Sequence, residues 1–220
     1  MEKFEQEKER EIYYAKIDFF TNVAHEIRTP LTLINGPLEN ILLKKTVDPE
    51  IREDLNIMKQ NTERLLSLTN QLLDFRKTES QGFRLNFAEC NVTEVLKETY
   101  NRFTSLARQR ELDFVLNVAE QDFYAHVNKE AFTKIVSNLL NNAVKYAETY
   151  VHVFLEMNGI GEKRMFYIRT VNDGVIIPNE MKEEIFKPFV RFNEKEDGKV
   201  TTGTGIGLAL SRSLACLLYT

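Results

Sequence analysis

A histidine and a glutamate stand side by side at His25 and Glu26, and Thr29 follows four residues after the histidine. An imidazole nitrogen is a nucleophile, and an adjacent carboxylate can orient the ring or take its proton. Apolar residues recur around this pair in alternating steps of four and three, which is typical of a helix packed in a bundle. His25 falls just outside that apolar seam, so we expect it on the flank of the bundle, where a bulky donor molecule can reach it. Pro30 lies inside the pattern and predicts a kink, because it removes one backbone hydrogen bond.

Two long helices are expected to carry this site. The seam of the first comprises Tyr13, Ile17, Phe20, Ala24, Ile27, Leu31, Ile34, Leu38 and Ile41. Residues 44–50 predict a break, with Asp48 as the cap of a second helix and Pro49 in its first turn. The seam of that helix comprises Ile51, Leu55, Met58, Thr62, Leu65, Thr69 and Leu72. A hairpin with this much apolar surface is expected to pair with a second copy in a four-helix bundle, although a structural coiled-coil spacer would show the same stripes.

The string from residue 25 to residue 31 resembles the phosphoacceptor box of the sensor histidine kinases of two-component signalling. The resemblance makes His25 the phosphorylated residue and Glu26 its acid–base partner. It also makes Thr29 a candidate for orienting water in the reverse, phosphatase reaction. Because Thr29 shares the helix face of His25, the geometry permits both roles. Without the resemblance, a histidine beside a glutamate on an amphipathic helix is usually a solvated pair.

A second polar string lies at residues 138–146. On a helix, Asn138, Asn142 and Lys145 share one face, where amide oxygens can help to coordinate Mg²⁺ and a lysine can neutralise phosphate charge. Exposed polar fillers are the alternative, although asparagine is mildly unfavourable inside a helix. The string resembles the asparagine box of the gyrase and histidine-kinase ATP-binding superfamily. That resemblance implies that Asn142 is the main Mg²⁺ ligand, that Asn138 assists it and that Tyr146 lies near the base of ATP.

Asn138 also marks a departure within that superfamily. ATPases of the gyrase type carry a glutamate at this position, where it activates water. With an amide in its place we expect slow hydrolysis, so that the phosphoryl group is left for another nucleophile, namely His25.

Residues 172–178 resemble the first glycine box of the superfamily, with two departures. Gly174 fits the pattern, whereas Asn172 stands where an aspartate binds adenine and Ile176 replaces the second glycine. An asparagine oxygen still accepts a hydrogen bond from the adenine amine, but without a charge. Asn-Asp-Gly is also a common turn, so the segment alone is equally compatible with a plain turn.

Residues 185–192 resemble the phenylalanine box and make Arg191 a candidate phosphate contact, although the same aromatic residues also suit an ordinary core cluster. Three alternate glycines then open a helix, which lets backbone N–H groups approach phosphate oxygens at its positive end. The nucleotide-binding residues implied here are Gly203, Thr204, Gly205, Gly207 and Leu208. The polar run 193–202 has the composition of a mobile lid.

Composition limits the remaining possibilities. The 220 residues are 43% hydrophobic and 28% charged, as in ordinary globular proteins of one or two domains. A net charge of −4 with mixed signs gives no electrostatic case for nucleic acid or for direct contact with an anionic membrane. There is no apolar run of membrane-spanning length and no signal-peptide pattern. Cys90 and Cys216 lie far apart, which suits a reducing compartment without disulfides.

The periodicity changes near Gly82, so we expect two domains, residues 1–81 and residues 82–220. The expected fold class is α+β: a helical hairpin forming a dimeric four-helix bundle, then an α/β sandwich with helices on one face of a mixed sheet. Expected strands are 84–87, 112–118, 150–157 and 165–171, and expected helices are 91–110, 129–147 and the segment after residue 205. The resembling family continues past that last helix with a glycine turn and two more strands, so we expect an exposed sheet edge here.

Taken together, the resemblance implies the catalytic core of a sensor histidine kinase, the cytoplasmic portion of a membrane-anchored sensor, hybrid sensors included. ATP and Mg²⁺ are its implied ligands, and a second copy and a response-regulator receiver domain are its implied partners. Two alternatives stay open: a signalling and dimerisation module with weak or no nucleotide binding, and a gyrase-like ATPase.

Overall fold

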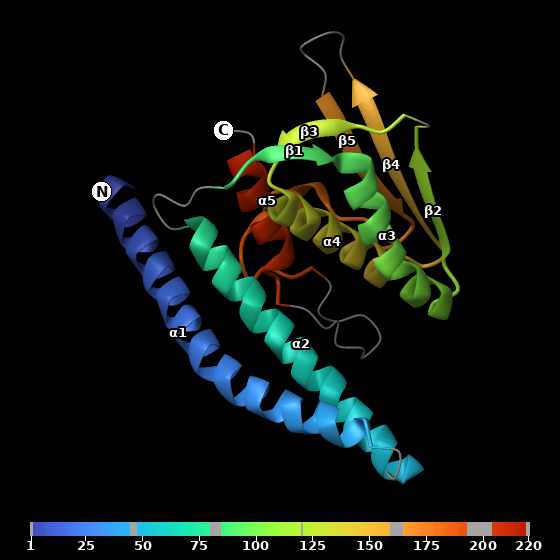
Figure 1. The fold of residues 1–220 in the computed structure, drawn as a ribbon. Helices are drawn as coiled ribbons and strands as arrows, with labels where there is room; N and C mark the ends of the chain where they lie inside the picture. The colour runs from blue at the N-terminus through green and yellow to red at the C-terminus, as the bar shows by residue number, and fades with distance from the viewer. Residues whose placement is uncertain are drawn as a thin grey trace. The chain divides into compact units, whose positions relative to one another are not determined.

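The computed structural model describes residues 2–44, 48–79, 85–119, 121–158, 165–192 and 204–218. The chain divides into two units, residues 1–83 and residues 84–220. The first unit is a helical hairpin, and the second combines helices with two sheets (Figure 1).

Helices α1 (Glu2–Leu42) and α2 (Pro49–Glu79) pack against each other to form the hairpin. Asp48 caps α2 as predicted, because its Oδ1 accepts a hydrogen bond from the backbone N–H of Glu50 at 2.9 Å. Helix α1 continues through Pro30 and also through Pro37, and Figure 1 shows it bowed along its length. The two prolines are seven residues apart and so lie close to one face, where their distortions add to a common bend.

Each predicted seam divides into two lines. On α1 the residues spaced by seven at Ile17, Ala24, Leu31 and Leu38 are buried, with exposures of 1%, 2%, 7% and 5%. The seam residues between them stay exposed at 40%, 44% and 38%, and they are Ile27, Ile34 and Ile41. On α2 the seam residues Thr62, Thr69 and Leu72 are buried, whereas Ile51, Met58 and Leu65 are exposed. The hairpin therefore buries part of each seam and presents a line of apolar residues on each helix to solvent.

Arg52 joins the two helices at the connection. Helix α1 has no basic residue in its last turn, so its terminal carbonyls need donors from elsewhere. The Arg52 guanidinium, on α2, donates to the carbonyl oxygens of Leu42 and Lys44, both at 2.8 Å. Its charge also suits the negative end of the helix dipole.

The second unit contains two sheets. Strands β1 (Ala88–Asn91) and β3 (Tyr124–Val127) pair antiparallel. Strands β2 (Asp113–Val118), β4 (Tyr150–Asn158) and β5 (Met165–Asn172) form the second sheet in the order β2-β4-β5. The β2–β4 pair is parallel and the β4–β5 pair is antiparallel, which makes this sheet mixed as expected.

Two strand predictions need correction. The strand expected at residues 84–87 is absent among its described residues, because 85–87 have no regular structure and β1 begins only at Ala88. Strand β3 was not predicted at all. Each of these strands has four residues and finds its hydrogen-bond partners some 35 residues away along the chain, so local periodicity carries little information about either.

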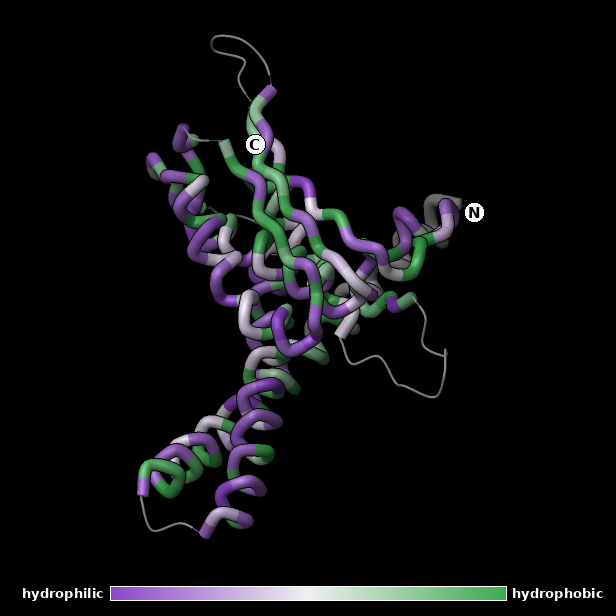
Figure 2. The backbone as a smooth tube through the Cα atoms, turned by 90° about the vertical axis from the view of Figure 1, so that its right-hand side faces the viewer, coloured by the Kyte–Doolittle hydropathy of each residue, from purple (hydrophilic) through white to green (hydrophobic). Residues whose placement is uncertain are grey.

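Helices α3 (Val92–Gln109), α4 (Lys129–Tyr146) and α5 (Gly207–Leu218) form the helical layer of this unit, with α4 packed against both of the others and against β5 (Figure 1). The short 3-10 helices η2 (Asn179–Met181) and η3 (Glu184–Phe186) precede α5. Buried residues alternate along β4 at Val151, Val153 and Leu155, and Figure 2 shows that hydrophobic residues are frequent along the strands of this unit. The core lies between this face and residues such as Leu96, Leu140 and Val144.

Within the described segments, β5 pairs with β4 alone and forms an edge of the three-stranded sheet. None of the helices described combines the length and the apolar character that crossing a membrane would require.

Candidate functional site

His25 lies on the exposed side of α1, next to a residue that anchors the helix. Ala24 is 2% exposed against α2, while His25, Glu26 and Thr29 are all exposed. Thr29 is one helical turn past His25 and shares its face. The structure therefore presents the imidazole, the adjacent carboxylate and the threonine hydroxyl on the solvent side of the hairpin.

The turn after His25 is tied to the other helix. The Arg28 guanidinium donates a hydrogen bond to Asn70 Oδ1 on α2. Pro30 cannot bond the carbonyl of Glu26, so the helix loses one internal hydrogen bond at this turn. The Arg28–Asn70 contact holds α1 and α2 together where the backbone of α1 is weakened.

Helix α4 carries the polar string of residues 138–146. Asn128 caps its start, with Oδ1 accepting from the backbone N–H of Ala131 at 2.8 Å. Val136, Leu140 and Val144 are at most 1% exposed and hold one face of the helix in the core. The polar positions consequently fall on the opposite side, half buried and accessible to a ligand.

Asn138 connects α4 to the first turn of α5. Its Nδ2 donates to the carbonyl oxygen of Gly207 at 3.1 Å and to Ser211 Oγ at 3.2 Å. The Ser211 hydroxyl donates in turn to the Gly207 carbonyl at 3.0 Å. The amide nitrogen of Asn138 is thus committed to α5, whereas its Oδ1 is the end of the amide that remains to face a cation.

Lys145 and Tyr146 interact with each other at the end of α4. Lys145 Nζ donates to the Tyr146 hydroxyl at 2.8 Å and lies 4.5 Å from the centre of the ring. Asn142 is half buried and lies one turn from Asn138 and one turn from Tyr146. It is therefore placed midway between the contact with α5 and the end of the helix.

Gly174 brings the end of β5 against the end of α4. A Cβ atom at Gly174 would lie 1.9 Å from the carbonyl oxygen of Tyr146 and 2.9 Å from Asn172 Nδ2, so only glycine permits this approach. Asn172 is opposite Val151 in the sheet register, and Val151 is fully buried, so Asn172 faces the helices. Ile176 is 87% exposed, and its side chain stands in solvent. Asn172, Gly174 and the backbone carbonyl of Tyr146 therefore lie close together.

A buried polar atom close to this point suits a polar ligand. Thr170 Oγ1 is buried without a hydrogen-bond partner among the described residues. Thr170 is opposite Val153 in the register and so shares the helix-facing side of β5 with Asn172. Buried hydroxyls are rarely left unpaired, which makes a ligand or water at this position chemically reasonable.

Gly205 and Phe189 form a backbone contact ahead of α5. Both have left-handed backbone conformations, with φ of 69° at Gly205 and 68° at Phe189. The Phe189 N–H donates to the Gly205 carbonyl at 3.0 Å, and a Cβ at Gly205 would lie 2.7 Å from the Val190 carbonyl oxygen. Glycine is needed at this position on both grounds, and it fixes the approach of the chain to the N-terminus of α5.

The other residues of the phenylalanine and glycine boxes flank that contact. Arg191 and Leu208 are half buried, and Thr204 Oγ1 accepts from the Ile206 N–H at 3.3 Å. Gly203 and the expected lid at 193–202 lie outside the described residues.

Asp173 and Arg110 contribute to the site and were not found by sequence reasoning. The Arg110 guanidinium donates to the carbonyl oxygens of Val144 and, at 3.1 Å, Ala147 at the end of α4. The hydrogen bond from the Thr149 hydroxyl is the largest effect on the pKa of Asp173 and lowers it; burial opposes this, and smaller effects of backbone N–H groups lower it further, so that the pKa lies well below its ordinary value. The sequence offered one signal for this contact, the carboxylate of Asp173 next to Asn172 and Gly174. That segment also fits an ordinary turn, so the role of Asp173 was not predicted.

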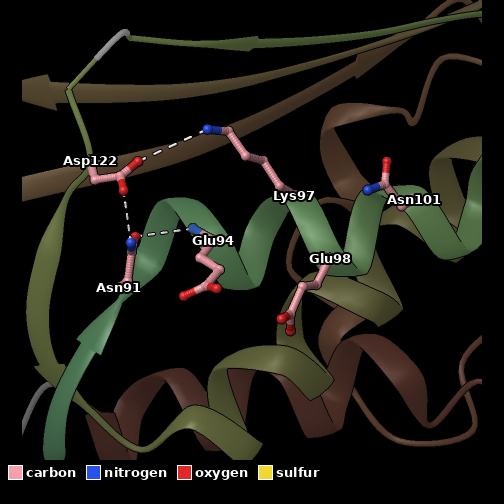
Figure 3. A pocket seen from close by; sticks show the side chains of 6 residues that line it. All are labelled: Asn91, Glu94, Lys97, Glu98, Asn101 and Asp122. Atoms are coloured by element: carbon pink, nitrogen blue, oxygen red, sulfur yellow. Dashed lines mark hydrogen bonds and ion pairs between the residues drawn. The ribbon is translucent and has the colours of Figure 1, made fainter.

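A hollow of about 300 Å³ lies elsewhere, along α3 (Figure 3). Its polar groups bond largely to one another, because Asp122 accepts from Asn91 at 2.9 Å and pairs with Lys97 at 3.9 Å. It also holds the carboxylates of Glu94 and Glu98. Three carboxylates against one ammonium repel a triphosphate, so this hollow is not the nucleotide site.

Comparison with known proteins identifies both units. Residues 15–81 match the His Kinase A (phospho-acceptor) domain, and residues 127–219 match the domain described as histidine kinase-, DNA gyrase B- and HSP90-like ATPase. The chain belongs to the histidine kinases. Its matched ranges contain the exposed His25 and the convergent residues around α4, respectively.

The relatives are histidine kinases by name. The chain is 32% identical over 98% of its length to histidine kinase P4 of Formosa agariphila, covering 16% of that protein. It is 28% identical over 90% of its length to the sensor histidine kinase WalK of Bacillus subtilis, covering 32% of it. The chain thus spans a minor part of these proteins. The names favour a histidine kinase over a gyrase-like ATPase and over a signalling and dimerisation module with weak or no nucleotide binding.

Solved structures agree on the fold. ShkA, whose structure was determined at full length in complex with AMPPNP, aligns with a TM-score of 0.70 and 23% identity, over 91% of this chain and 41% of that one. The Acinetobacter baumannii histidine kinase AdeS aligns with a TM-score of 0.57 and 22% identity, over 88% of this chain and 86% of that one. A helical part followed by an α/β ATP-binding domain is therefore the fold of this histidine kinase.

Proposed function

We propose that His25 takes the γ-phosphoryl group of ATP and then passes it to an aspartate on a response-regulator receiver domain. The observation that carries this proposal is the hydrogen bonding of the Asn138 side chain. At the position where a gyrase-type ATPase has a water-activating glutamate, this chain has an amide whose nitrogen is bound to Gly207 and Ser211. No carboxylate stands there to activate water, so an exposed imidazole is the better nucleophile.

The chemistry at His25 is an in-line displacement at phosphorus. One ring nitrogen forms the N–P bond as the P–O bond to the departing ADP breaks, and Glu26 accepts the proton from the other ring nitrogen. The phosphoryl group later leaves the imidazole for a carboxylate oxygen of the receiver aspartate. Thr29, one turn from His25, is placed to orient water when the phosphoryl group is instead removed by hydrolysis.

The second unit supplies the nucleotide site. Asn142 is the proposed Mg²⁺ ligand, with Oδ1 of Asn138 as a second oxygen, because amide oxygens suit this hard cation. Asn172, Gly174 and Tyr146 form the side that binds the base. The phosphate side is formed by Lys145, Arg191, Gly203, Thr204, Gly205, Gly207 and Leu208, where backbone N–H groups at the start of α5 favour anions.

The exposed apolar lines of the hairpin support a homodimer. Ile27, Ile34 and Ile41 on α1 are 38–44% exposed although they repeat every seven residues. Ile51, Met58 and Leu65 on α2 repeat in the same way and are 46–56% exposed. A second copy packing its own lines against these completes a four-helix bundle. We further propose that the chain is the cytoplasmic part of a membrane-anchored sensor, as its relationship to sensor kinases suggests.

The decisive experiment is phosphorylation with γ-labelled ATP and Mg²⁺, comparing the parent chain with His25→Gln and His126→Gln. His126 is a matched control, because it is also exposed but lies on β3 and has no part in the proposed reaction. Acid-labile, base-stable label on the parent and on His126→Gln, but not on His25→Gln, is expected. Equal labelling of His25→Gln would overturn the assignment, and steady phosphate release without labelled protein would favour an ATPase.

A further inference from the structure

The turn between α4 and β4 is held by a single carboxylate from the end of β5. Asp173 Oδ1 accepts hydrogen bonds from the backbone N–H groups of Glu148 and Thr149, both at 3.0 Å, and of Tyr150 at 3.2 Å. Asp173 Oδ2 accepts from the Thr149 N–H at 2.9 Å and from the Thr149 hydroxyl. Three successive backbone N–H groups that follow α4 are thereby bonded by one side chain.

The carbonyl side of the same turn is held from another direction. Arg110, at the end of α3, bonds the carbonyl oxygens of Val144 and Ala147. The Thr149 carbonyl accepts from the Asp113 N–H at 2.8 Å. With Asp173 on the N–H groups and Arg110 on the carbonyls, the end of α4 has one defined position relative to the end of β5.

Asp173 is not itself free to bind a base, because both of its oxygens accept the hydrogen bonds of the turn. Asn172, the preceding residue, faces the helices through its register with Val151. Gly174, the following residue, is in contact with the Tyr146 carbonyl and lies beside Asn172 Nδ2. Asn172 and Gly174, on the proposed base-binding side, are therefore the chain neighbours of Asp173. Tyr146, the third residue of that side, lies at the end of α4, just before the turn that Asp173 holds.

We propose that Asp173 is a positioning residue for base recognition, which acts by fixing the α4–β4 turn so that the Asn172 amide is directed at the 6-amino group of adenine beside Tyr146. This inference rests on the proposed function, since it assumes that the site binds ATP. An uncharged asparagine in place of the family's aspartate gains less from each hydrogen bond, so its discrimination depends more on being held in position.

The test compares the ATP affinity of the parent, Asp173→Ala, Asn172→Ala and the double variant by titration calorimetry with Mg²⁺. A second ligand, purine riboside triphosphate, lacks the 6-amino group and reports whether that group is recognised. Asp122→Ala is the matched control, because Asp122 is also an exposed, hydrogen-bonded carboxylate but lies on the α3 side. Asp173→Asn keeps one oxygen that can accept a hydrogen bond from the turn. It is therefore a milder substitution than Asp173→Ala and should disturb folding less.

The parent is expected to prefer ATP over purine riboside triphosphate by about three- to tenfold, the worth of one hydrogen bond. Asp173→Ala should reduce that preference toward one, with Asp173→Asn intermediate and Asp122→Ala unchanged. In the Asn172→Ala background, removing Asp173 should have little further effect on the ratio, because Asp173 acts through Asn172. Thermal unfolding of each variant shows whether it is folded at the temperature of the titration.

The outcomes separate the inference from the proposed function. A parent that binds ATP, together with a folded Asp173→Ala or Asp173→Asn variant of unchanged base preference, would overturn the positioning role alone. Equal loss of affinity for both nucleotides would show a purely structural role and also overturn it. A folded parent that binds neither nucleotide would overturn the proposed function and this inference with it.

Discussion

In the helical hairpin several residues of each apolar seam stay exposed, whereas residues at the centre of the second unit are excluded from solvent altogether. Ile34 and Met58 are 44% and 51% exposed, while Leu96 and Leu140 are fully buried. Both units have regular hydrophobic periodicity, so the periodicity alone does not show which of them is complete. The hairpin has the surface of half a bundle, and the second unit has a core of its own.

The polar contacts differ in the same way. In the hairpin they join one helix to the other, as Arg28 does with Asn70, Lys59 with Glu39 and Arg52 with the end of α1. In the second unit charged groups fix turns and helix ends, as Asp173 and Arg110 do around α4.

The largest effect is expected from a charge on the exposed line of the hairpin. Ile34→Glu would place one unpaired carboxylate from each copy in the dimer interface, at a cost of about 3–5 kcal/mol per charge. Sedimentation should show a monomer where the parent is a dimer, with the second unit still folded. Leu33→Glu is the control, because Leu33 is 70% exposed and lies off the line, so its dimer should persist. A dimer that survives Ile34→Glu would mean that another surface pairs the copies.

A truncation in the core of the second unit should behave differently. Leu140→Ala removes a fully buried side chain and is expected to reduce the free energy of unfolding by about 2–5 kcal/mol. Because that core lies within one chain, the loss should not vary with protein concentration. Urea unfolding followed by circular dichroism at two concentrations tests this. Marked dependence on concentration would show that the second unit also needs a partner.

Glycine substitutions sharpen the contrast between the units. Gly174→Ala puts a methyl group 1.9 Å from the Tyr146 carbonyl, so the backbone must move, at a cost of about 1–3 kcal/mol and with weaker ATP binding. Gly36→Ala in α1 meets nothing within 4 Å and should be neutral or stabilising by up to about 1 kcal/mol. Thermal unfolding of both variants compares them directly. Similar effects at the two positions would contradict the close approach at Gly174.

The smallest expected effect is a dependence of the free energy of unfolding on pH. The pKa of Asp173 is lowered in the folded chain, so its contribution to stability is present above the ordinary aspartate value of about 4 and is lost as pH falls through the lower folded value. The stability difference between the parent and Asp173→Ala should therefore be largest at neutral pH and shrink in acid. Urea unfolding at a series of pH values measures it, and a difference that stays constant down to pH 3 would show that the carboxylate is not bonded as described.

Much of the fold followed from local patterns. The two long helices, the cap at Asp48, and strands β2, β4 and β5 were predicted because each has a strong period or an end signal within a few residues. Strands β1 and β3 were predicted wrongly or missed, since their pairing is set by residues far away in the chain. The division of the hairpin seams into buried and exposed residues also needed the structure, because threonines are buried on α2 while Ile51, Met58 and Leu65 are exposed.

The candidate site likewise has features that the local sequence predicted and features that only the tertiary structure decided. The sequence by itself determined which residue types are present: His25 beside Glu26, the asparagines of α4 and the glycines ahead of α5. Only the tertiary structure decided what these groups are bonded to, such as Asn138 to the first turn of α5. It also decided that Asp173 holds a turn while Asn172 faces the helices, because adjacent residues at the end of a strand point to opposite sides and strand pairing selects the side.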